Sequence, residues 1–376
     1  MTLRVAFYAP MKPLDHPVPS GDRQLGRLIR RALIEAGHDV AIGATTRTWS
    51  RHGGPEQEAL RAEAEAEAET IIAEWRDAPA PPADLWFTYH LYHKAPDWIG
   101  PRVADAFSLP YVVAEASRAL KRAHGPWALG FASADAALKR AAAVIALHQE
   151  DAAGLSAVVP AKRIRLVPPF IDTTAFRVRA MTLNPPKPVR LLTIAMMRAG
   201  DKERSYRVLA DALNRLAAYP WTLTIAGDGE AAERLRPLFP PDRTTWLGRV
   251  DPDRVPDLCS KSDVFVWPAV NEAFGLVFLE AQAAGLAVVG GRSGGVPDLV
   301  EHGKTGYLAP EGDDSGFADA LRTLFDHPER IPVFGRAGQS AVRDKHGLNT
   351  GGLSLSAILE AVVSDGTLSG SGQAAT

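Results

Sequence analysis

Two carboxylates with seven residues between them, Glu272 and Glu280, are the side chains whose spacing points most directly to chemistry. Glu272 follows an apolar run in a short loop, and Glu280 falls inside the helix expected after Gly275. A carboxylate that deep in a helix is badly placed for an anion at the helix start, but it can accept hydrogen bonds from sugar hydroxyls. We therefore expect Glu280 to bind the ribose of a nucleotide.

Gly275, between the two glutamates, is suited to the close approach of a ligand. It has no side chain, and the amides of the helical turn after it have no intrahelical acceptor. These free donors and the helix dipole favour an anion such as a diphosphate. We place the flanking residues Phe274 and Leu276 in the same substrate-binding turn.

The surrounding pattern predicts the elements that would hold these residues in place. Apolar runs at 264–267 and 286–289 predict two buried strands, and 276–284 has apolar residues at helical spacing up to Gly285. Glycine pairs at 290–291 and 294–295 follow the second strand. Because the carboxyl ends of parallel strands share one edge of a sheet, both loops are expected to open on one ligand crevice.

The stretch 262–310 resembles the signature of the large retaining glycosyltransferase family with the GT-B fold, which has a Glu, seven residues, Glu pattern before a GG.PE-like turn. The motif here is EAFGLVFLE, and Asp298 replaces the usual glutamate of that turn. The resemblance implies an α/β protein of two Rossmann-like domains whose parallel sheets face across a cleft. An ordinary Rossmann-like unit with surface glutamates is the alternative.

The resemblance also implies an activity, the retaining transfer of a sugar from a UDP-, GDP- or ADP-linked donor to an acceptor. Glu272 would then position the transferred sugar, and Arg198 and Lys202 would meet the donor diphosphate as it leaves. The spacing between these two cations is one residue shorter than the common pattern, and a surface pair of basic residues is the alternative. Gly21, in the first loop of the chain, would contact the diphosphate from the other domain.

Other functions compete with this interpretation. The run Gly227–Ala232 satisfies the dinucleotide fingerprint G-x-G-x-x-A, but the acidic residue expected about 20 positions later is missing, which argues against a dehydrogenase. A nucleotide-sugar epimerase of the same fold would need an acid and a base around the sugar. A non-catalytic nucleotide-sugar binding protein also stays open.

The first half of the chain is expected to bind the acceptor. The apolar run 85–89 precedes His90, Tyr92 and His93, and the run 109–114 precedes Glu115 and Ser117. Polar groups at the ends of such strands commonly face a ligand cleft. Relatives often have a histidine where this chain has Ala116, so the acceptor-side groups and the acceptor itself are not assigned.

Length and composition set the domain organisation. A chain of 376 residues predicts two domains, which we place at 1–175 and 176–365, with a proline-rich linker within 173–188. Residues 366–376 contain few apolar side chains and are expected to be a disordered tail. The acidic and alanine-rich run 57–76 predicts a helix with a solvated face.

Charge and composition limit the kinds of ligand and partner that we expect. A formal net charge of -2 gives no reason to expect nucleic acid, and one cysteine, Cys259, excludes an internal disulfide framework. No cofactor is expected, and no metal, since no His/Cys cluster has ligand spacing. The chain is expected in the cytoplasm. Four arginines at helical spacing allow peripheral contact with an anionic membrane, although a solvated helix is the favoured explanation: Arg23, Arg27, Arg30 and Arg31.

Overall fold

The computed structural model describes residues 1–17, 20–176 and 187–370 and divides into two compact units. Unit 1 comprises Met1–Pro169 and Leu348–Thr376, and unit 2 comprises Phe170–Gly347. The expected division at 175/176 differs from this one by six residues, and 348–365 lies in unit 1 rather than in the second domain. Most of the proposed linker, 177–186, lies outside the described residues.

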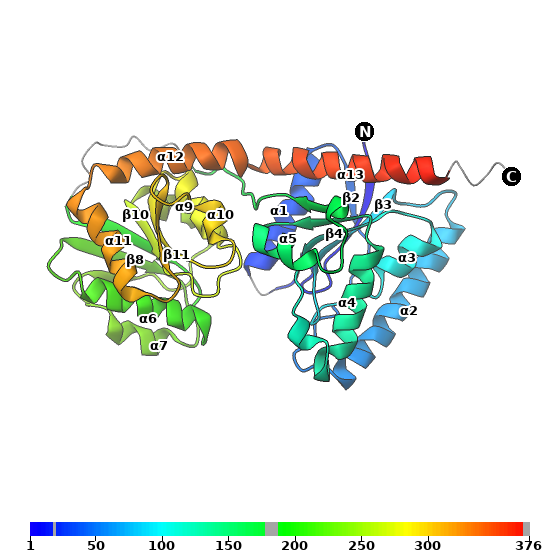
Figure 1. Ribbon diagram of the computed structural model, residues 1–376, viewed down its shortest axis with the longest axis horizontal. Helices are drawn as coiled ribbons and strands as arrows, with labels where there is room; N and C mark the ends of the chain where they lie inside the picture. Colours follow the sequence, from blue (N-terminus) through cyan, green and yellow to red (C-terminus); the bar gives the residue numbers. More distant parts are fainter. Residues whose placement is uncertain (18–19, 177–186, 371–376) are drawn as a thin grey trace. The chain divides into compact units, whose positions relative to one another are not determined.

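Unit 1 contains a six-stranded parallel sheet with the strand order β2-β1-β3-β4-β5-β6 (Figure 1). The order reverses between β1 and β3, which is the point where open α/β sheets bind ligands. The strands are β1 (Arg4–Tyr8), β2 (Asp39–Ile42), β3 (Leu85–Leu91), β4 (Tyr111–Ala116), β5 (Ala143–Ala146) and β6 (Ile164–Leu166). The α-helices are α1 (Gly21–Glu35), α2 (Pro55–Asp77), α3 (Gly100–Ala106), α4 (Ala128–Arg140), α5 (Gln149–Leu155) and α13 (Leu348–Gly370).

The core of unit 1 explains why its central strands are apolar throughout. Every residue of β4 is buried, because helices cover both faces of the sheet (Figure 1). Trp86 and Tyr111 fill the space between the sheet and the helices α2, α3 and α4. In α2, as expected, alanines 64 and 68 face this core while the glutamates between them lie at or near the surface.

Unit 2 contains a second six-stranded parallel sheet with the order β12-β11-β10-β7-β8-β9 (Figure 1). The expected strand before Glu272, β10, pairs directly with β7, so the loops after both strands lie at one edge as predicted. The strands are β7 (Val189–Ile194), β8 (Trp221–Ala226), β9 (Thr244–Trp246), β10 (Val264–Trp267), β11 (Ala287–Arg292) and β12 (Gly306–Pro310). The α-helices are α6 (Asp201–Asn214), α7 (Ala232–Leu235), α8 (Val255–Ser260), α9 (Leu276–Ala283), α10 (Val296–Leu299), α11 (Asp314–Asp326) and α12 (Arg330–Lys345).

One strand boundary in unit 2 differs from the prediction. Gly290 and Gly291 do not end β11, which continues to Arg292 and pairs with β12 up to that residue. A side chain at Gly291 would overlap the carbonyl oxygen of Pro268 in the neighbouring loop. The glycine is therefore needed inside the strand, where another chain segment approaches closely.

The final helix, α13, belongs to unit 1 and packs along α1. A side chain at Gly352 would come within 2.7 Å of the Ala32 carbonyl oxygen, so the two helices meet closely there. The helix extends to Gly370, so 366–370 is helical rather than the start of a disordered tail, and 371–376 lies outside the described residues. Among the described helices, none has the length and apolar character needed to cross a membrane.

Candidate functional site

Three loops of unit 2 meet at the carboxyl edge of its sheet and bring together the residues that the sequence singles out. They follow β7, β10 and β11, and they contain Arg198, then Glu272 and Gly275, and then the glycine turn before α10, while Lys202 lies in the first turn of α6, directly after the first of these loops. We refer to Arg198, Lys202, Glu272, Gly275 and Glu280 as the Glu272 site. The hydrogen bond from the Gly295 amide to the Ala273 carbonyl, at 2.8 Å, ties two of these loops to one another.

Glu272 and Lys202 form an ion pair through Oε2 and Nζ, although they are far apart in the sequence. The Trp267 indole donates a hydrogen bond of 3.2 Å to the same Oε2 atom, and the Lys202 ammonium lies 5.4 Å from the centre of the indole ring. Both charged side chains are only partly exposed, at 16% for Glu272 and 27% for Lys202. The Glu272 carboxylate is therefore held in one place, while part of both side chains stays exposed to solvent.

The start of α9 has the features expected of an anion site. Gly275 is in the left-handed conformation with a φ of 67°, and no side chain caps the helix. Within the described residues, the amides of Leu276 and Val277 donate to no acceptor. Phe274 is buried at 9% exposure and Leu276 is half-buried. The geometry leaves two oriented donors beside a glycine.

Glu280 lies one turn further along α9 and is held apart from the charges around it. Burial raises the pKa of its carboxyl group to about 7. No described residue forms a hydrogen bond or an ion pair with this carboxylate. Glu280 is half-buried, and a partly desolvated carboxylate without donors is destabilised when it is ionised, a cost that hydroxyl groups of a ligand would relieve. This arrangement is the one predicted for a ribose-binding residue.

Arg198 lies in the same loop as the start of α6, and its side chain is exposed. Its guanidinium forms no hydrogen bond within the described part of the chain. Backbone hydrogen bonds are the largest cause of the lowered pKa of Glu230, and the positive charge of Arg198 lowers it further. Arg198 is thus near the loop after β8, and it does not join the ion pair of Lys202 and Glu272.

The glycines of the 227–232 run support the Arg198 loop. Gly227 and Gly229 have φ values of 149° and 155°, and a side chain at either would overlap the carbonyl oxygens of Ala195 and Met197, respectively. The Met197 amide in turn donates to the Asp228 carbonyl at 2.9 Å. These glycines let one loop pack against the other, which accounts for the fingerprint without a dinucleotide.

Gly21, the residue expected to reach the diphosphate from the first domain, begins α1 in unit 1. The Ser20 hydroxyl caps this helix by accepting from the Arg23 amide at 3.2 Å, and a side chain at Gly21 would meet nothing within 4 Å. Packing inside the chain therefore does not require a glycine here. Its proposed contact with a donor stays a prediction.

Unit 1 holds an acid and histidine cluster that the sequence shows only in part. His90 is the second-last residue of β3 and is half-buried, and its Nδ1 lies 3.3 Å from Glu115 Oε2 and 3.7 Å from Asp22 Oδ1. Burial alone would lower the pKa of His90, but the charges of Glu115 and Asp22 outweigh it and raise the pKa to about 9. Among the described residues, these three have donor atoms close enough, within 4.8 Å, to hold a metal ion.

This cluster lies where the strand order of unit 1 reverses, since β1 precedes Asp22 and β3 and β4 contain the other two residues. His90 and Glu115 both have positive φ values, of 66° and 55°. Non-glycine residues in that conformation occur preferentially at functional sites. The sequence predicted polar groups here, but Asp22 also fits the ordinary preference for acids in a first helical turn, so nothing marked it.

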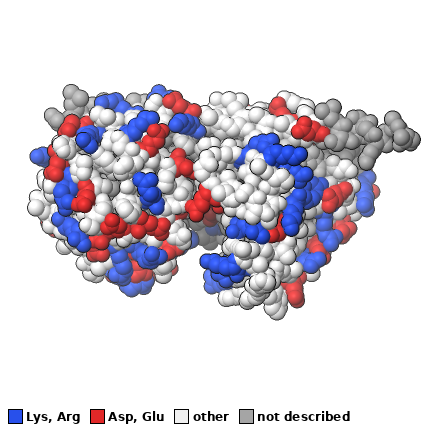
Figure 2. All heavy atoms as spheres, in the orientation of Figure 1, with Lys and Arg blue, Asp and Glu red and all other residues white. Residues whose placement is uncertain are grey.

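The arginines proposed for membrane contact have partners within unit 1. Arg27 donates to the Leu14 carbonyl at 2.6 Å, and Arg30 donates to the Val40 carbonyl at 2.9 Å. Arg31 pairs with Glu35 at 2.7 Å, and Arg23 donates to the His16 carbonyl. Figure 2 shows longer runs of basic side chains over unit 1 than over unit 2, where acids and bases alternate. The α1 arginines hold local structure together.

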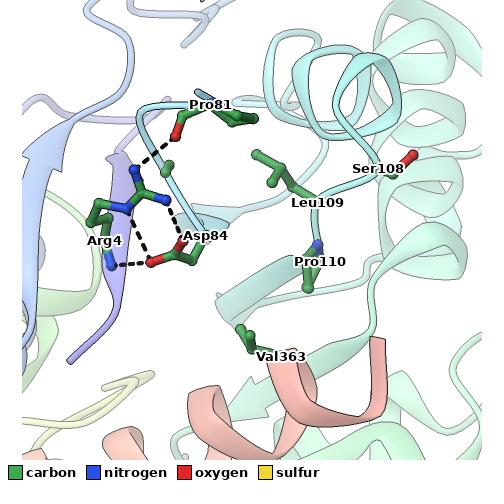
Figure 3. Close-up of a pocket in the computed structure, with 8 residues that line it drawn as sticks. Arg4, Pro81, Asp84, Ser108, Leu109, Pro110 and Val363 are labelled. Carbon is green, nitrogen blue, oxygen red and sulfur yellow. Dashed lines mark hydrogen bonds and ion pairs between the residues drawn. The ribbon is translucent and has the colours of Figure 1, made fainter. Parts of the chain in front are cut away.

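A pocket in unit 1 lies at the opposite edge of its sheet (Figure 3). Arg4 lines it, but its guanidinium already donates to Asp84 at 2.6 Å and to the Pro81 carbonyl at 2.9 Å. Leu109, Pro110 and Val363 supply apolar lining. Because its polar groups are satisfied by one another and lie at the amino ends of the strands, this pocket has no features of a substrate site.

Comparison with known proteins identifies the fold of the chain and a family match in its second unit. Residues 188–327, which contain Glu272, Glu280, Arg198 and Lys202, match the family described as glycosyl transferases group 1. The chain has the GT-B fold: it matches sucrose-phosphate synthase from Thermosynechococcus elongatus with a TM-score of 0.76 at 19% identity, covering 96% of this chain and 99% of that one. Anabaena HepE in complex with UDP-glucose matches with a TM-score of 0.68 at 17% identity, covering 96% and 100%.

Curated relatives match over part of their length. The sulfoquinovosyl transferase SQD2 of Arabidopsis thaliana is 33% identical over 200 residues, which is 50% of this chain and 38% of the relative. A GDP-mannose-dependent phosphatidylinositol monomannoside mannosyltransferase of Mycobacterium tuberculosis is 32% identical over 204 residues, which is 50% of this chain and 53% of the relative. The alignments thus span about half or less of these relatives.

Proposed function

We propose that the chain is a retaining glycosyltransferase that moves a sugar from a nucleoside-diphosphate sugar to an acceptor. The observation that supports it most is the half-buried Glu280 carboxylate, which has a raised pKa, has no donor of its own among the described residues and follows the free amides at the start of α9. The names of similar proteins include UDP-glucose and GDP-mannose as bound or used donors. The proposal covers donors linked to UDP, GDP or ADP.

The successive parts of the donor would bind to successive residues of the Glu272 site along α9. The amides after Gly275 and the helix dipole favour the diphosphate, and Glu280 accepts the ribose hydroxyls one turn later. Glu272, on the loop before the helix, then lies on the side of the transferred sugar. Its carboxylate can accept hydrogen bonds from sugar hydroxyls and stabilise positive charge on the ring.

The ion pair of Lys202 and Glu272 places a cation where it could stabilise the leaving diphosphate. Lys202 is bonded to Glu272 before substrate binds, and a donor diphosphate offers the ammonium a second negative partner beside it. Negative charge on the diphosphate grows as the glycosidic bond breaks, so Lys202 and the exposed Arg198 bind the transition state more strongly than the ground state. Arginine adds bidentate geometry to the compact charge of lysine.

Unit 1 would bind the acceptor. The cluster of Asp22, His90 and Glu115 is at the carboxyl edge of that sheet, where hydroxyl groups of an acceptor could exchange hydrogen bonds with the imidazole and the carboxylates. His90 is protonated over the ordinary pH range because its pKa is about 9, which suits it to donate rather than to accept a proton.

A screen of UDP-, GDP- and ADP-sugars by mass spectrometry tests the proposal. Slow release of a nucleoside diphosphate, lost in Glu272→Gln, is the expected result. Conversion of a nucleotide sugar to its isomer would replace the proposal with an epimerase, and binding without any turnover would replace it with a non-catalytic binding protein. Once a product is found, proton NMR of the fresh linkage gives its anomeric configuration, and an inverted linkage would contradict retention.

A further inference from the structure

Two histidines three positions apart in unit 1 have opposite surroundings. His90 faces the carboxylates of Glu115 and Asp22, whereas His93, in the loop after β3, is surrounded by cations. Burial and then the positive charges of Arg122, Lys94 and Lys121 lower the pKa of His93 to about 4. The carboxyl edge of this sheet therefore has an acidic end and a basic end.

The basic end is built from two neighbouring strand ends. His93 and Lys94 follow β3, and Lys121 and Arg122 form the short 3-10 turn after β4, which pairs with β3. The Lys94 ammonium lies 5.0 Å from the centre of the Trp127 ring, and that ring contacts the His93 ring at 5.7 Å. The cations thus come from two neighbouring strand ends at one sheet edge, and the Trp127 ring holds Lys94 there.

These cations lack the acidic partners that neighbouring residues have. Arg118 pairs with Asp135 at 2.8 Å, whereas Lys94, Lys121 and Arg122 form no ion pair with any described residue. Both ring nitrogens of His93 are buried and have no hydrogen-bond partner within the described chain. Unsatisfied buried polar atoms beside unpaired charges are a costly arrangement that a bound ligand would relieve.

A row of aromatic rings joins the two ends. Tyr92 contacts the His90 ring at 5.1 Å and the His93 ring at 5.3 Å. The Trp49 indole donates to the Tyr92 hydroxyl at 3.1 Å, and the Arg47 guanidinium lies 4.7 Å from the centre of the Trp49 ring. Aromatic rings offer faces on which the apolar side of a sugar or cyclic polyol can stack.

We propose that this edge of unit 1 binds an anionic polyol, with hydroxyl groups at the His90 end and a phosphate or carboxylate at the basic end formed by Lys94, Lys121 and Arg122. The inference rests on the proposed function in one respect, that the bound polyol is the acceptor. An anion there offsets the mutual repulsion of three cations, and its oxygen atoms accept charge-assisted hydrogen bonds. The acidic end repels the same anion, so the two ends set the direction in which it binds.

Calorimetry with glucose 6-phosphate and glucose as probes tests this site on the full chain. The donor site is first saturated with the nucleoside diphosphate that binds best, so that phosphate cannot enter it. Glucose 6-phosphate should bind at least about tenfold more tightly than glucose, which corresponds to one charge-assisted contact. The advantage should shrink as salt is raised, because the Debye length falls.

A pair of matched double variants locates the effect. Lys121→Gln/Arg122→Gln should abolish the preference for the phosphorylated probe. Lys139→Gln/Lys162→Gln removes the same charge from residues at the amino edge of the same sheet, and it should keep the preference. Equal loss in both variants, or no preference in the unaltered protein, would overturn the inference.

Two further measurements identify the source of the anion and distinguish failure of this inference from failure of the proposed function. Co-sedimentation with phosphatidylcholine vesicles, with and without phosphatidylglycerol, gives binding that depends on Lys121 and Arg122 if the anion is a lipid headgroup, and no such binding if it is a free phosphate. If glucose 6-phosphate binds but no donor is turned over, the site stands and the transferase proposal fails. If a donor is turned over but the phosphorylated probe shows no preference, only the inference about the acceptor fails.

Discussion

At the scale of single residues, the site in unit 2 depends on charges that are paired with one another or left without partners. Glu272 is held by Lys202 and by the Trp267 indole, so its carboxylate is oriented before substrate binds. Glu280, in contrast, has no such partner among the described residues, and burial raises its pKa. The two glutamates should therefore differ in what they contribute, one to the reaction and the other to nucleotide binding.

Glu272→Gln should lower turnover at saturating donor by at least about tenfold and leave the affinity for the nucleoside diphosphate nearly unchanged. The amide keeps the shape but cannot balance positive charge on the sugar ring in the transition state. Steady-state kinetics and calorimetry on the same preparation measure the two effects. A variant that lost nucleotide binding as severely as Glu280→Ala would instead indicate a structural or ribose-binding role.

Arg198→Ala and Lys202→Ala should each reduce turnover at saturating donor by at least about tenfold, because removal of one donor to a developing oxyanion costs on the order of a hundredfold. Arg198 should give the larger effect, since Lys202 also interacts with Glu272 in the free protein. If both variants turned over normally with saturating donor, the two cations would serve binding alone, and the leaving group would be stabilised elsewhere.

At the scale of elements, glycines determine how the loops of unit 2 pack. Gly227 and Gly294 have positive φ values, and a side chain at either would overlap a carbonyl oxygen, of Ala195 or of Glu272. The loop after β8 thereby supports the Arg198 loop, and the loop after β11 supports the Glu272 loop. These glycines bring together the backbone segments that hold the charged residues.

Gly227→Ala should destabilise the protein by about 1 to 3 kcal/mol more than Gly312→Ala. Both glycines have positive φ values, of 149° and 75°, but a side chain at Gly312 would meet nothing within 4 Å. The comparison therefore isolates the overlap with Ala195. Thermal unfolding of both variants gives the difference, and nucleotide affinity should fall in Gly227→Ala alone. Equal stability of the two variants would show that the loops can separate without cost.

The sequence predicts the helices and strands that have strong apolar periodicity, and it does not predict features without such a pattern. Both sheets, the helix after Gly275 and the juxtaposition of Lys202 with Glu272 at one edge follow from apolar runs and loop glycines. The runs could not show that β11 continues through Gly291, because glycine usually ends a strand and only the nearby Pro268 carbonyl explains it. The partnership of Asp22 with His90 depends on strand order, which local patterns do not encode.

At the scale of the whole molecule, the end of the chain completes the unit formed by its beginning. α13 packs on α1, and His38 joins α13 to the first strand segment: its Nδ1 accepts from the Leu3 amide at 3.1 Å, and its Nε2 lies 2.8 Å from Ser356 Oγ. Burial lowers the pKa of His38, so the imidazole is neutral in the folded protein. The terminal helix is thus part of the core of unit 1.

This contact predicts a pH dependence of stability. Because the folded-state pKa of His38 is lowered, the unfolded chain binds more protons as pH falls below about 6.5, and the folded state loses stability there. His38→Gln keeps a neutral acceptor and donor, and its melting temperature should fall less between pH 7 and pH 5 than that of the unaltered protein. Parallel pH profiles of the two proteins would contradict this role for His38.

The central claim, that unit 2 binds a nucleotide sugar through the Glu272 site, is tested most directly by calorimetry of UDP, GDP and ADP against the unaltered protein and Glu280→Ala. One nucleotide should bind, and the variant should lose about 1 to 3 kcal/mol of its binding free energy. Ribose hydroxyls favour the ionised carboxylate, whose pKa is about 7 in the free protein, so affinity should rise between pH 6 and pH 8 in the unaltered protein by more than in the variant. Equal affinity and equal pH dependence in the two proteins, or no binding of any of the three nucleotides, would contradict the claim.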